Sequence, residues 1–339
     1  MKVQSIRLWT MSIVCLFMLF ANLAAQEGKI SGYIFGDYFY EFSHPEAATE
    51  ALKRNGFQLR RAYFTYDRDL SEKFAVRLRL EMNSPDLTRT QTFGTSSQLV
   101  PYIKHAYLRW NNFIPQGKLS FGQIGTPTYM LAEEAWGYRA VEKTVMDLRR
   151  LAPSSDLGIA LEGKFTKAGV LNYQIFVANG TGTNSETDKT KRVYFNLPVK
   201  IQGGYSVVPY FDYEGGLDGK SKNAVAVFAG VQKPSFHGGV EVFQKKSNKA
   251  LANNTDRTEN GFSVFGAVRA AEKIKLLARY DVYDPNTDLD DDGNTFIIAG
   301  LDFAPEKNVN IIPNLKIENY QAAGRDANAT GLLTVFFKF

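Results

Sequence analysis

The sequence has little of three features that commonly stabilise a chain or reveal its class. Its only cysteine, Cys15, lies in an apolar N-terminal segment, so the rest of the chain cannot form an internal disulfide. Beyond residue 25 there is no apolar run long enough for a transmembrane helix. The net charge is small, because 40 Lys and Arg less Lys2 and Arg7 leave 38 against 35 Asp and Glu. These absences argue against a disulfide scaffold, a helical membrane domain and a protein that binds nucleic acid.

Motifs that carry chemistry are also scarce. The three histidines, His44, His105 and His237, lack the spacing of a zinc site, and no G-x-S-x-G nucleophile motif occurs. Residues 288–293 imitate the start of a calcium-binding loop, but Ala299 stands where the bidentate glutamate would be. The sequence therefore predicts no enzyme, no cofactor and no metal site. A divalent-cation site in this acidic loop is the alternative to a plain external loop.

The N-terminal segment has the order of a secretory signal. Lys2 and Arg7 precede an apolar run over 8–21, and small residues follow up to Ala25. We predict a signal peptide at 1–25 and a mature chain of 26–339. An uncleaved membrane anchor is the alternative, while a lipoprotein signal is disfavoured because Val14 precedes Cys15.

What the sequence does contain is alternation with a period of two. Over 74–82 the residues Phe, Val, Leu, Leu and Met alternate with Ala, Arg, Arg and Glu, which gives a strand one apolar and one charged face. Similar stretches recur along the chain, and the 17 Tyr and 25 Phe add aromatic residues. A soluble sandwich also alternates, but it rarely carries such a charged second face. A strand with one face in lipid and one in water fits the pattern better.

The spacing of these stretches predicts the architecture. Long and short gaps alternate along most of the chain, as do the external loops and periplasmic turns of outer-membrane barrels. We therefore expect an all-β fold, a transmembrane antiparallel β-barrel of about 16 strands in the outer membrane of a Gram-negative bacterium. Pro198, Pro209 and Pro313 fall inside expected strands, where we expect bulges or strand ends. The expected strands are 29–41, 57–68, 72–83, 100–111, 117–125, 156–165, 170–179, 191–202, 204–213, 222–232, 236–246, 260–271, 274–284, 294–304, 308–320 and 329–339.

Several segments, in chain order, resemble the phosphate-selective porin O and P family. Residues 57–64, FQLRRAYF, resemble its early strand, and His105 to Trp110 resemble its D-A-Y-V segment. Shorter matches occur at 121–127, 156–163, 178–180 and 278–281. His105 stands where that family often has Asp, Ser155 where it often has Arg, and no run matches its arginine ladder. The resemblance implies a porin fold and role, but not phosphate specificity.

The longest connector after the signal, 126–154, is the expected constriction loop. A long stretch without strand pattern is usually functional or disordered, and this one is rich in charges. By resemblance to sixteen-strand porins, the loop after the fifth strand folds inward and narrows the pore. The alternative is a lid outside the barrel.

The inward faces of the expected strands carry more basic than acidic side chains. Arg60 and Arg61 cannot both face the interior of a regular strand, and Arg61 is assigned inward because Ala62, Phe64 and Tyr66 then share the lipid face. Local ion pairing would cancel part of this basic excess. The residues expected to line the pore or bind anions are Arg61, Arg77, Arg79, Tyr107, Arg109, Arg139, Lys143, Arg149, Arg150 and Arg279.

These features predict a porin for passive diffusion of small anionic or polar solutes, with preference for anions and phosphate-like anions among them. The alternatives are a weakly selective porin and a barrel with a structural, adhesive or enzymatic role. Outer-membrane lipid, a homotrimer and the barrel assembly machinery are the other expected partners. The assembly machinery would read the terminal Phe339, which ends an aromatic-rich last strand.

Overall fold

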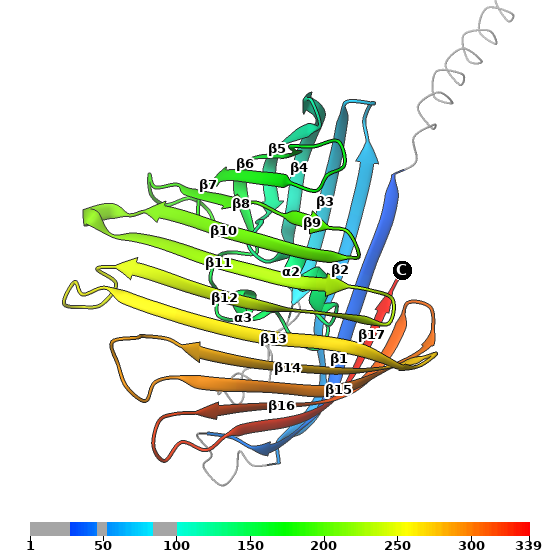
Figure 1. The fold of residues 1–339 in the computed structure, drawn as a ribbon, viewed down its shortest axis with the longest axis vertical. Coiled ribbons are helices and arrows are strands. Elements are labelled where there is room, and N and C mark those ends of the chain that lie inside the picture. The colour runs from blue at the N-terminus through cyan, green and yellow to red at the C-terminus, as the bar shows by residue number, and fades with distance from the viewer. Residues whose placement is uncertain (1–27, 46–52, 84–99) are drawn as a thin grey trace, which may run out of the picture.

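A computed structural model describes residues 28–45, 53–83 and 100–339. The expected signal peptide lies outside the described residues, as do 46–52 of the expected external loop 42–56 and the whole of the expected external loop 84–99. The described chain is almost entirely strand (Figure 1). Its elements are β1 (Lys29–Ser43), β2 (Asn55–Asp69), β3 (Phe74–Asn83), β4 (Val100–Ile114), β5 (Gly117–Gly125), α2 (Met130–Trp136), α3 (Val145–Leu148), β6 (Ser155–Lys164), β7 (Asn172–Ala178), β8 (Arg192–Asn196), β9 (Val199–Ile201), β10 (Tyr205–Gly215), η1 (Leu217–Gly219), β11 (Ser221–Gln232), β12 (Phe236–Asn248), β13 (Arg257–Ala271), β14 (Ile274–Asp284), β15 (Asn294–Glu306), β16 (Val309–Tyr320) and β17 (Asn328–Lys338).

The strands form one closed antiparallel barrel. Strands that follow one another in sequence pair, apart from β8 and β9, and β1 pairs with β17 to close the ring. Phe339 extends this seam, because its backbone exchanges two hydrogen bonds with Gly32 of β1. Strands β8 and β9 both pair with β10, so they are two halves of one stave. The barrel therefore has sixteen staves, as the sequence predicts, and closure leaves no free sheet edge.

The prolines explain the one divided stave. Pro198 lies between β8 and β9, which confirms the expected strand end. Pro209 of β10 faces this break, because its carbonyl accepts a hydrogen bond from Leu197 (3.1 Å) and its nitrogen points to the same side. The missing N–H of Pro209 therefore falls where the partner strand is already interrupted. Neither the expected bulge nor a strand end occurs at Pro209, since β10 continues to Gly215 and pairs with β11 in continuous register. β16 likewise stays in register with β17 through Pro313.

Side chains divide between two faces as the alternation predicts. On β3, Leu78 points outward and is 39% exposed, whereas Glu81 points inward and is 1% exposed. Apolar side chains such as Val227, Val242 and Val264 form the exposed outer surface around the barrel. An apolar outer band of this kind is the surface that a membrane covers.

The two ends of the barrel differ. The connectors 126–154, 179–191, 216–220, 249–256, 285–293 and 321–327 lie at one end, called here the loop end. Short turns join the strands at the opposite end, called the turn end. None of the helices in the described part of the chain is long and apolar enough to cross a membrane.

Candidate functional site

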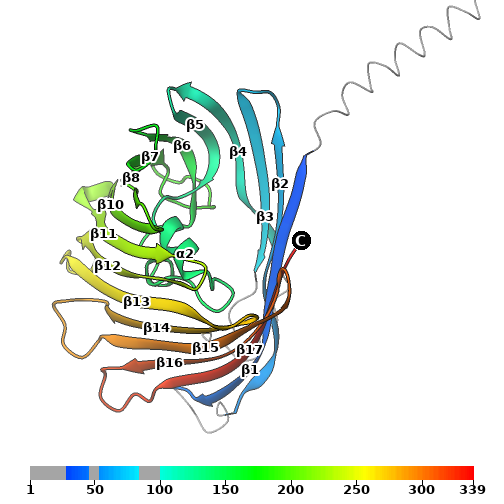
Figure 2. The same cartoon turned by 45° about the vertical axis from the view of Figure 1, so that its right-hand side comes forward.

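The connector 126–154, the constriction loop, folds into the barrel (Figure 2). Its helices α2 and α3 pack against the inner faces of β11, β12 and β13. Trp136 is fully buried, meets Phe265 of β13 edge-to-face at 5.5 Å, and donates its indole N–H to the carbonyl of Glu142 (2.9 Å). Val141 and Val145 are also fully buried inside the barrel. The loop is therefore part of the core, and the alternative of an external lid is wrong.

Three arginines of the barrel wall hold the loop by its backbone. Arg60 of β2 donates to the carbonyls of Ala140 and Val141 and pairs with Asp37 of β1. Each arginine has a carboxylate partner on the wall and a carbonyl partner on the loop, so its charge is neutralised while it fixes the loop.

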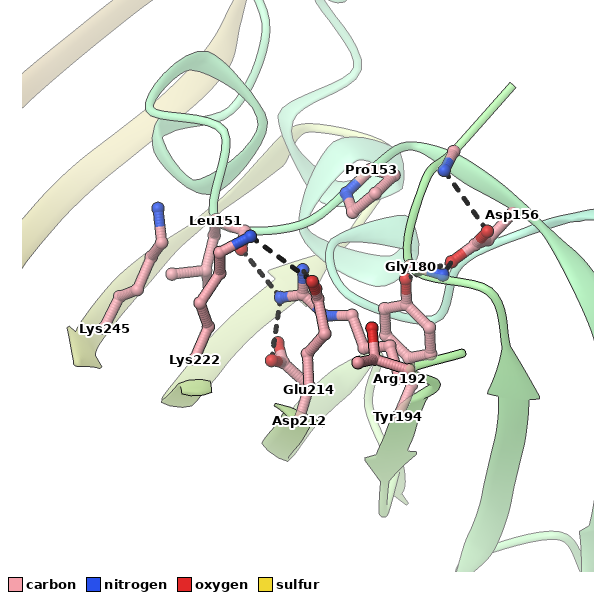
Figure 3. A network of polar contacts seen from close by, with 12 residues as sticks. Leu151, Pro153, Asp156, Gly180, Arg192, Tyr194, Asp212, Glu214, Lys222 and Lys245 are labelled. Carbon is pink, nitrogen blue, oxygen red and sulfur yellow. Dashed lines mark hydrogen bonds and ion pairs between the residues drawn. The ribbon is translucent and has the colours of Figure 1, made fainter. Parts of the chain in front are cut away.

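The other two arginines repeat this arrangement further round the barrel. Arg279 of β14 pairs with Asp281 (2.8 Å) and donates to the carbonyl of Lys143. Arg192 of β8 donates to the carbonyl of Leu151 (2.9 Å) and to Asp212 (2.7 Å), as Figure 3 shows.

Side-chain pairs add to these backbone anchors. Lys316 of β16 pairs with Glu142 (3.1 Å), and Tyr138 donates to Asp302 of β15 (3.1 Å). The guanidinium of Arg149 pairs with Glu318 (2.9 Å) and lies over a tyrosine ring of β14. The loop is thus anchored to staves from β8 round to β2, and it divides the barrel interior.

Cavities lie on both sides of the loop. One of about 950 Å³ opens at the loop end and is lined by Lys143, Asp147 and Arg150 of the loop and by residues of the connectors 179–191, 216–220 and 249–256. Another of about 720 Å³ opens at the turn end, below Glu133 and Arg139. The loop therefore lies between two cavities, one open at each end of the barrel.

Two β-bulges set the charge of the wall formed by the inward faces of β2 to β5, called here the basic wall. The register of β1 with β2 shifts at Arg60, so Arg60 and Arg61 both face the interior. The register of β3 with β4 shifts at Lys104, so Lys104 and His105 both face it. The expectation that one of the two arginines must point to lipid fails because a bulge places an extra residue on one strand.

Most cations of the basic wall have carboxylate partners. Arg61 and Lys104 both pair with Glu81, at 3.1 and 3.2 Å, and Arg77 pairs with Asp67 at 2.6 Å. Arg79 and Arg109 are the exceptions, because no carboxylate among the described residues lies within ion-pair distance of either.

Arg79 and Arg109 instead have neutral polar partners. Arg79 donates from Nε to the hydroxyl of Thr65 (2.8 Å), and its guanidinium lies 5.5 Å from the ring centre of Tyr63. Arg109 donates to the phenol of Tyr107 (3.1 Å), and its guanidinium lies 5.1 Å from that ring centre. Stacking on an aromatic face orients a guanidinium without removing its charge. Arg60 and Lys118 of the basic wall are paired with Asp37 of β1 and Glu162 of β6. The other five cations share only two carboxylate partners, and these cations are Arg61, Arg77, Arg79, Lys104 and Arg109 against Asp67 and Glu81.

The loop side of the constriction is closer to neutral. Arg139 pairs with Glu133 (3.3 Å) and Asp147 (3.6 Å), and Lys143 lies 3.8 Å from Asp147. Burial lowers the pKa of Lys143, and the Asp147 carboxylate opposes that effect. Arg139 also interacts electrostatically with Arg61 of the basic wall, so the two sides face each other.

The structure thus divides the sequence-predicted residues into two groups. Arg61, Arg77, Arg79, Tyr107 and Arg109 come together on the basic wall, with Arg139 opposite them. Lys143 and Arg150 line the loop-end cavity.

The second group, Arg149 and Arg279, holds the loop and lines neither of the two cavities. Arg279 is only 2% exposed and is committed to Asp281 and the loop, and Arg149 is bound to Glu318. Sequence reasoning missed Arg60 and Lys104, because only the partner strands reveal a bulge.

Two of the short matched segments meet in space. The buried carboxylate of Asp156 accepts hydrogen bonds from the backbone N–H groups of Gly180 (2.8 Å) and Gly182 (3.2 Å) and from the Tyr194 phenol (2.6 Å) (Figure 3). Both glycines have positive φ, 91° and 71°, a conformation that suits glycine. Asp156 therefore attaches the connector 179–191 to the barrel. The matched segments 156–163 and 178–180 thus have a structural role.

Within the described ranges, no three His, Cys, Asp or Glu side chains are grouped so that they could hold a metal ion. The calcium-like segment 288–293 therefore forms no such group.

Comparisons with known proteins support the fold. No family model matches the chain, and no curated protein matches it either. Solved structures do match: an anion-selective porin from Comamonas acidovorans (TM-score 0.65, 12% identity, 93% of this chain and 100% of that one) and the outer-membrane channel DcaP of Acinetobacter baumannii (0.64, 13%, 93% and 98%). A trimer form of OmpT, an outer-membrane protein of Vibrio cholerae, also matches (0.63, 15%, 93% and 100%). At these identities the likeness shows that the fold is that of outer-membrane porins.

Proposed function

We propose that this chain is a porin of the Gram-negative outer membrane, through which small solutes diffuse passively and anions pass more readily than cations. The observation that carries the anion preference is that no carboxylate in the part of the chain that the structure describes pairs with Arg79 or Arg109 of the basic wall. Their charge is held by hydroxyls and aromatic faces and stays available to a passing solute. Phosphate-like anions belong to the class that such a wall attracts. The sequence resemblance to the phosphate-selective porin O and P family supports the fold and does not indicate phosphate specificity.

Electrostatics supports a preference rather than tight binding. Rings of Arg and Lys favour anions in a pore, and low-dielectric walls focus the field of fixed charges. An unpaired cation about 4 Å from a permeating anion contributes about 1 kcal/mol even in bulk-water dielectric, or about a fivefold ratio. Arg61, Arg77 and Tyr107 complete the wall around Arg79 and Arg109, and Arg139, Lys143 and Arg150 approach from the loop side.

The rest of the proposal concerns location and assembly. A signal peptide at 1–25 would export the chain, and outer-membrane lipid would cover its apolar outer band. The assembly machinery would recognise Phe339, which sits on the closing seam. A homotrimer is in keeping with the trimer form among the structural neighbours. We infer no catalytic role, cofactor or nucleic-acid partner, because the interior residues described above either hold the loop in place or give the barrel interior its charge.

A weakly selective porin is the second candidate, and the ion pairs favour it. Arg61, Arg77 and Arg139 each lie within 4.0 Å of a carboxylate, so most fixed charges near the constriction cancel locally. The two candidates differ only in whether the two unpaired arginines dominate the pore.

The test is a reversal-potential measurement on the full chain, purified and reconstituted in planar bilayers across a KCl gradient. The natural protein is expected to show a reversal potential of the sign for Cl⁻ preference. Changing Arg79 and Arg109 together to Gln should lower the Cl⁻ to K⁺ permeability ratio by about fivefold or more, with the larger effect at low salt, where screening is weak.

Arg269→Gln is the matched control, because it removes one positive charge at the turn end of β13, away from the basic wall. It should leave the ratio almost unchanged. A natural protein without Cl⁻ preference would favour the weakly selective porin, and a lack of conductance would favour a barrel that is not a channel.

A further inference from the structure

Inward cations of this barrel commonly face a carboxylate directly across a strand pair. Arg77 of β3 is opposite Asp67 of β2, and the two form an ion pair at 2.6 Å. Lys245 of β12 is likewise opposite Glu259 of β13, with its ammonium 3.1 Å from the carboxylate. Directly opposite residues have Cβ atoms about 4.5–5.5 Å apart, which is close enough for such pairing.

The same rule puts Lys118 of β5 opposite Glu162 of β6, at 2.6 Å. The register of the barrel therefore neutralises these three inward cations by direct cross-strand pairing. An inward cation stays unneutralised where both opposite residues are uncharged and no carboxylate reaches it from another position, as Glu81 reaches Arg61.

Arg79 and Arg109 satisfy that condition. Arg79 is opposite Thr65 on β2 and His105 on β4. Arg109 is opposite Ala75 on β3 and Ser120 on β5. No carboxylate stands at any of these four positions.

The opposite residues nevertheless hold the arginines. Thr65 and Ser120 are each 2% exposed and lie beneath the guanidinium groups. The Thr65 hydroxyl accepts a hydrogen bond from Arg79 at 2.8 Å, and the Ser120 hydroxyl accepts one from Arg109 at 3.4 Å. The buried Nδ1 of His105 has no hydrogen-bond partner, so this ring contributes bulk beside Arg79 but no ion pair.

We propose that Thr65, His105 and Ser120 determine the ion preference of the channel, because they position Arg79 and Arg109 without neutralising them. The inference rests on the proposed function, since it needs a channel with anion preference. The selectivity then depends on the uncharged residues directly opposite the arginines, and not on the arginines alone. A carboxylate at any of the three positions would reproduce the Arg77–Asp67 arrangement and remove the unpaired charge.

The experiment compares Thr65→Asp and Ser120→Asp with the natural protein, by reversal potential in planar bilayers. Each change replaces a hydroxyl that already contacts an arginine with a carboxylate at the same place. Each should lower the Cl⁻ to K⁺ ratio by about fivefold, the effect of cancelling one unit charge near the ion path. His105→Asp reaches Arg79 from the other neighbouring strand and should act in the same direction.

Two controls separate pairing from other effects. Thr65→Ser keeps the hydroxyl that holds Arg79, so its ratio should stay much closer to that of the natural protein than the ratio of Thr65→Asp does. Gln174→Glu adds one negative charge on the inward face of β7, where the partners are Glu162 and Asn196 and no unpaired arginine lies opposite. Its effect on the ratio should be clearly smaller. Heat-modifiable migration in gels verifies that each variant is a folded barrel.

The outcomes are distinct. If the natural protein shows no Cl⁻ preference, the proposed function fails and this inference fails with it. If the natural protein prefers Cl⁻ but folded Thr65→Asp, Ser120→Asp and His105→Asp shift the ratio no more than Gln174→Glu, only the positioning role is overturned. Should one variant not fold, the other two still decide, because they lie on different strands.

Discussion

At the scale of single residues, the partners of an arginine decide what it does in this barrel. Arg60 and Arg279 pair with a carboxylate and donate to loop carbonyls, so they act as anchors. Arg79 and Arg109 have hydroxyl and aromatic partners, so their charge remains available. The sequence marks Arg79, Arg109 and Arg279 alike as inward-facing arginines and puts Arg60 on the opposite face.

The hydrogen bonds of Asp156 can be tested with a single substitution. Asp156→Asn replaces one carboxylate oxygen by an NH₂ group, which cannot accept the backbone N–H of Gly180 or Gly182. Each lost buried hydrogen bond costs about 1–3 kcal/mol. Hydrogen exchange of the connector 179–191 should therefore speed up by about tenfold or more, while the barrel strands keep their protection. Asp188→Asn in the same connector is the control, because the Asp188 side chain accepts its hydrogen bonds from Thr190, two residues away, and not from the barrel. Equal exchange in both variants would contradict this assignment.

At the scale of elements, the constriction loop is held in place by the wall more than by its own helices. Helix α3 has four residues and α2 has seven, too short to be stable alone. Their order comes from burial of Trp136 and from backbone bonds to wall arginines. Weakening one anchor should therefore let the loop move away from the wall and leave the barrel closed.

Arg279→Gln tests this dependence. The change leaves Asp281 buried without its partner and the Lys143 carbonyl without its donor, and breaking a buried pair costs about 3–5 kcal/mol. Single-channel current should become noisier and its mean conductance should rise, as the loop moves away from the wall. Adding Asp281→Asn should recover thermal stability, because no buried charge is then unpaired, but the noise should remain. A quiet channel of natural conductance in the single variant would show that Arg279 does not anchor the loop.

At the scale of the whole molecule, closure decides both stability and topology. Sixteen staves form a ring without a free edge, and the last residue completes the seam with β1. An even number of staves places the start of β1 and the end of β17 at the turn end, where they would face the periplasm. The long connectors, including the one that folds inward, would then start from the cell surface.

Surface labelling tests that orientation. Asp290 is exposed in the connector 285–293 at the loop end, and Lys167 is exposed in the turn between β6 and β7. Because Cys15 is expected to be removed with the signal, either position can carry the mature chain's single cysteine. A bulky maleimide should label Asp290→Cys on intact cells, and Lys167→Cys only after the outer membrane is permeabilised. The opposite pattern would reverse the proposed topology.

The sequence by itself determined the staves and their faces. In a strand, neighbouring side chains point to opposite sides, so the alternation at 74–82 reports directly which residues meet lipid and which face the interior. Gap lengths then predicted the loop end and the turn end, and the length and charge of 126–154 singled it out. These are local signals, which a chain carries before it folds.

Only the tertiary structure decided which charges remain free. The bulges at Arg60 and Lys104 depend on the register of β1 and β3, and an added residue in one strand leaves little trace in its own pattern. The register likewise placed Asp67 opposite Arg77 but Thr65 opposite Arg79. Charge cancels between residues that are close in space and distant along the chain. For that reason the strands could be predicted from the sequence, whereas the selectivity of the pore depends on how they pair.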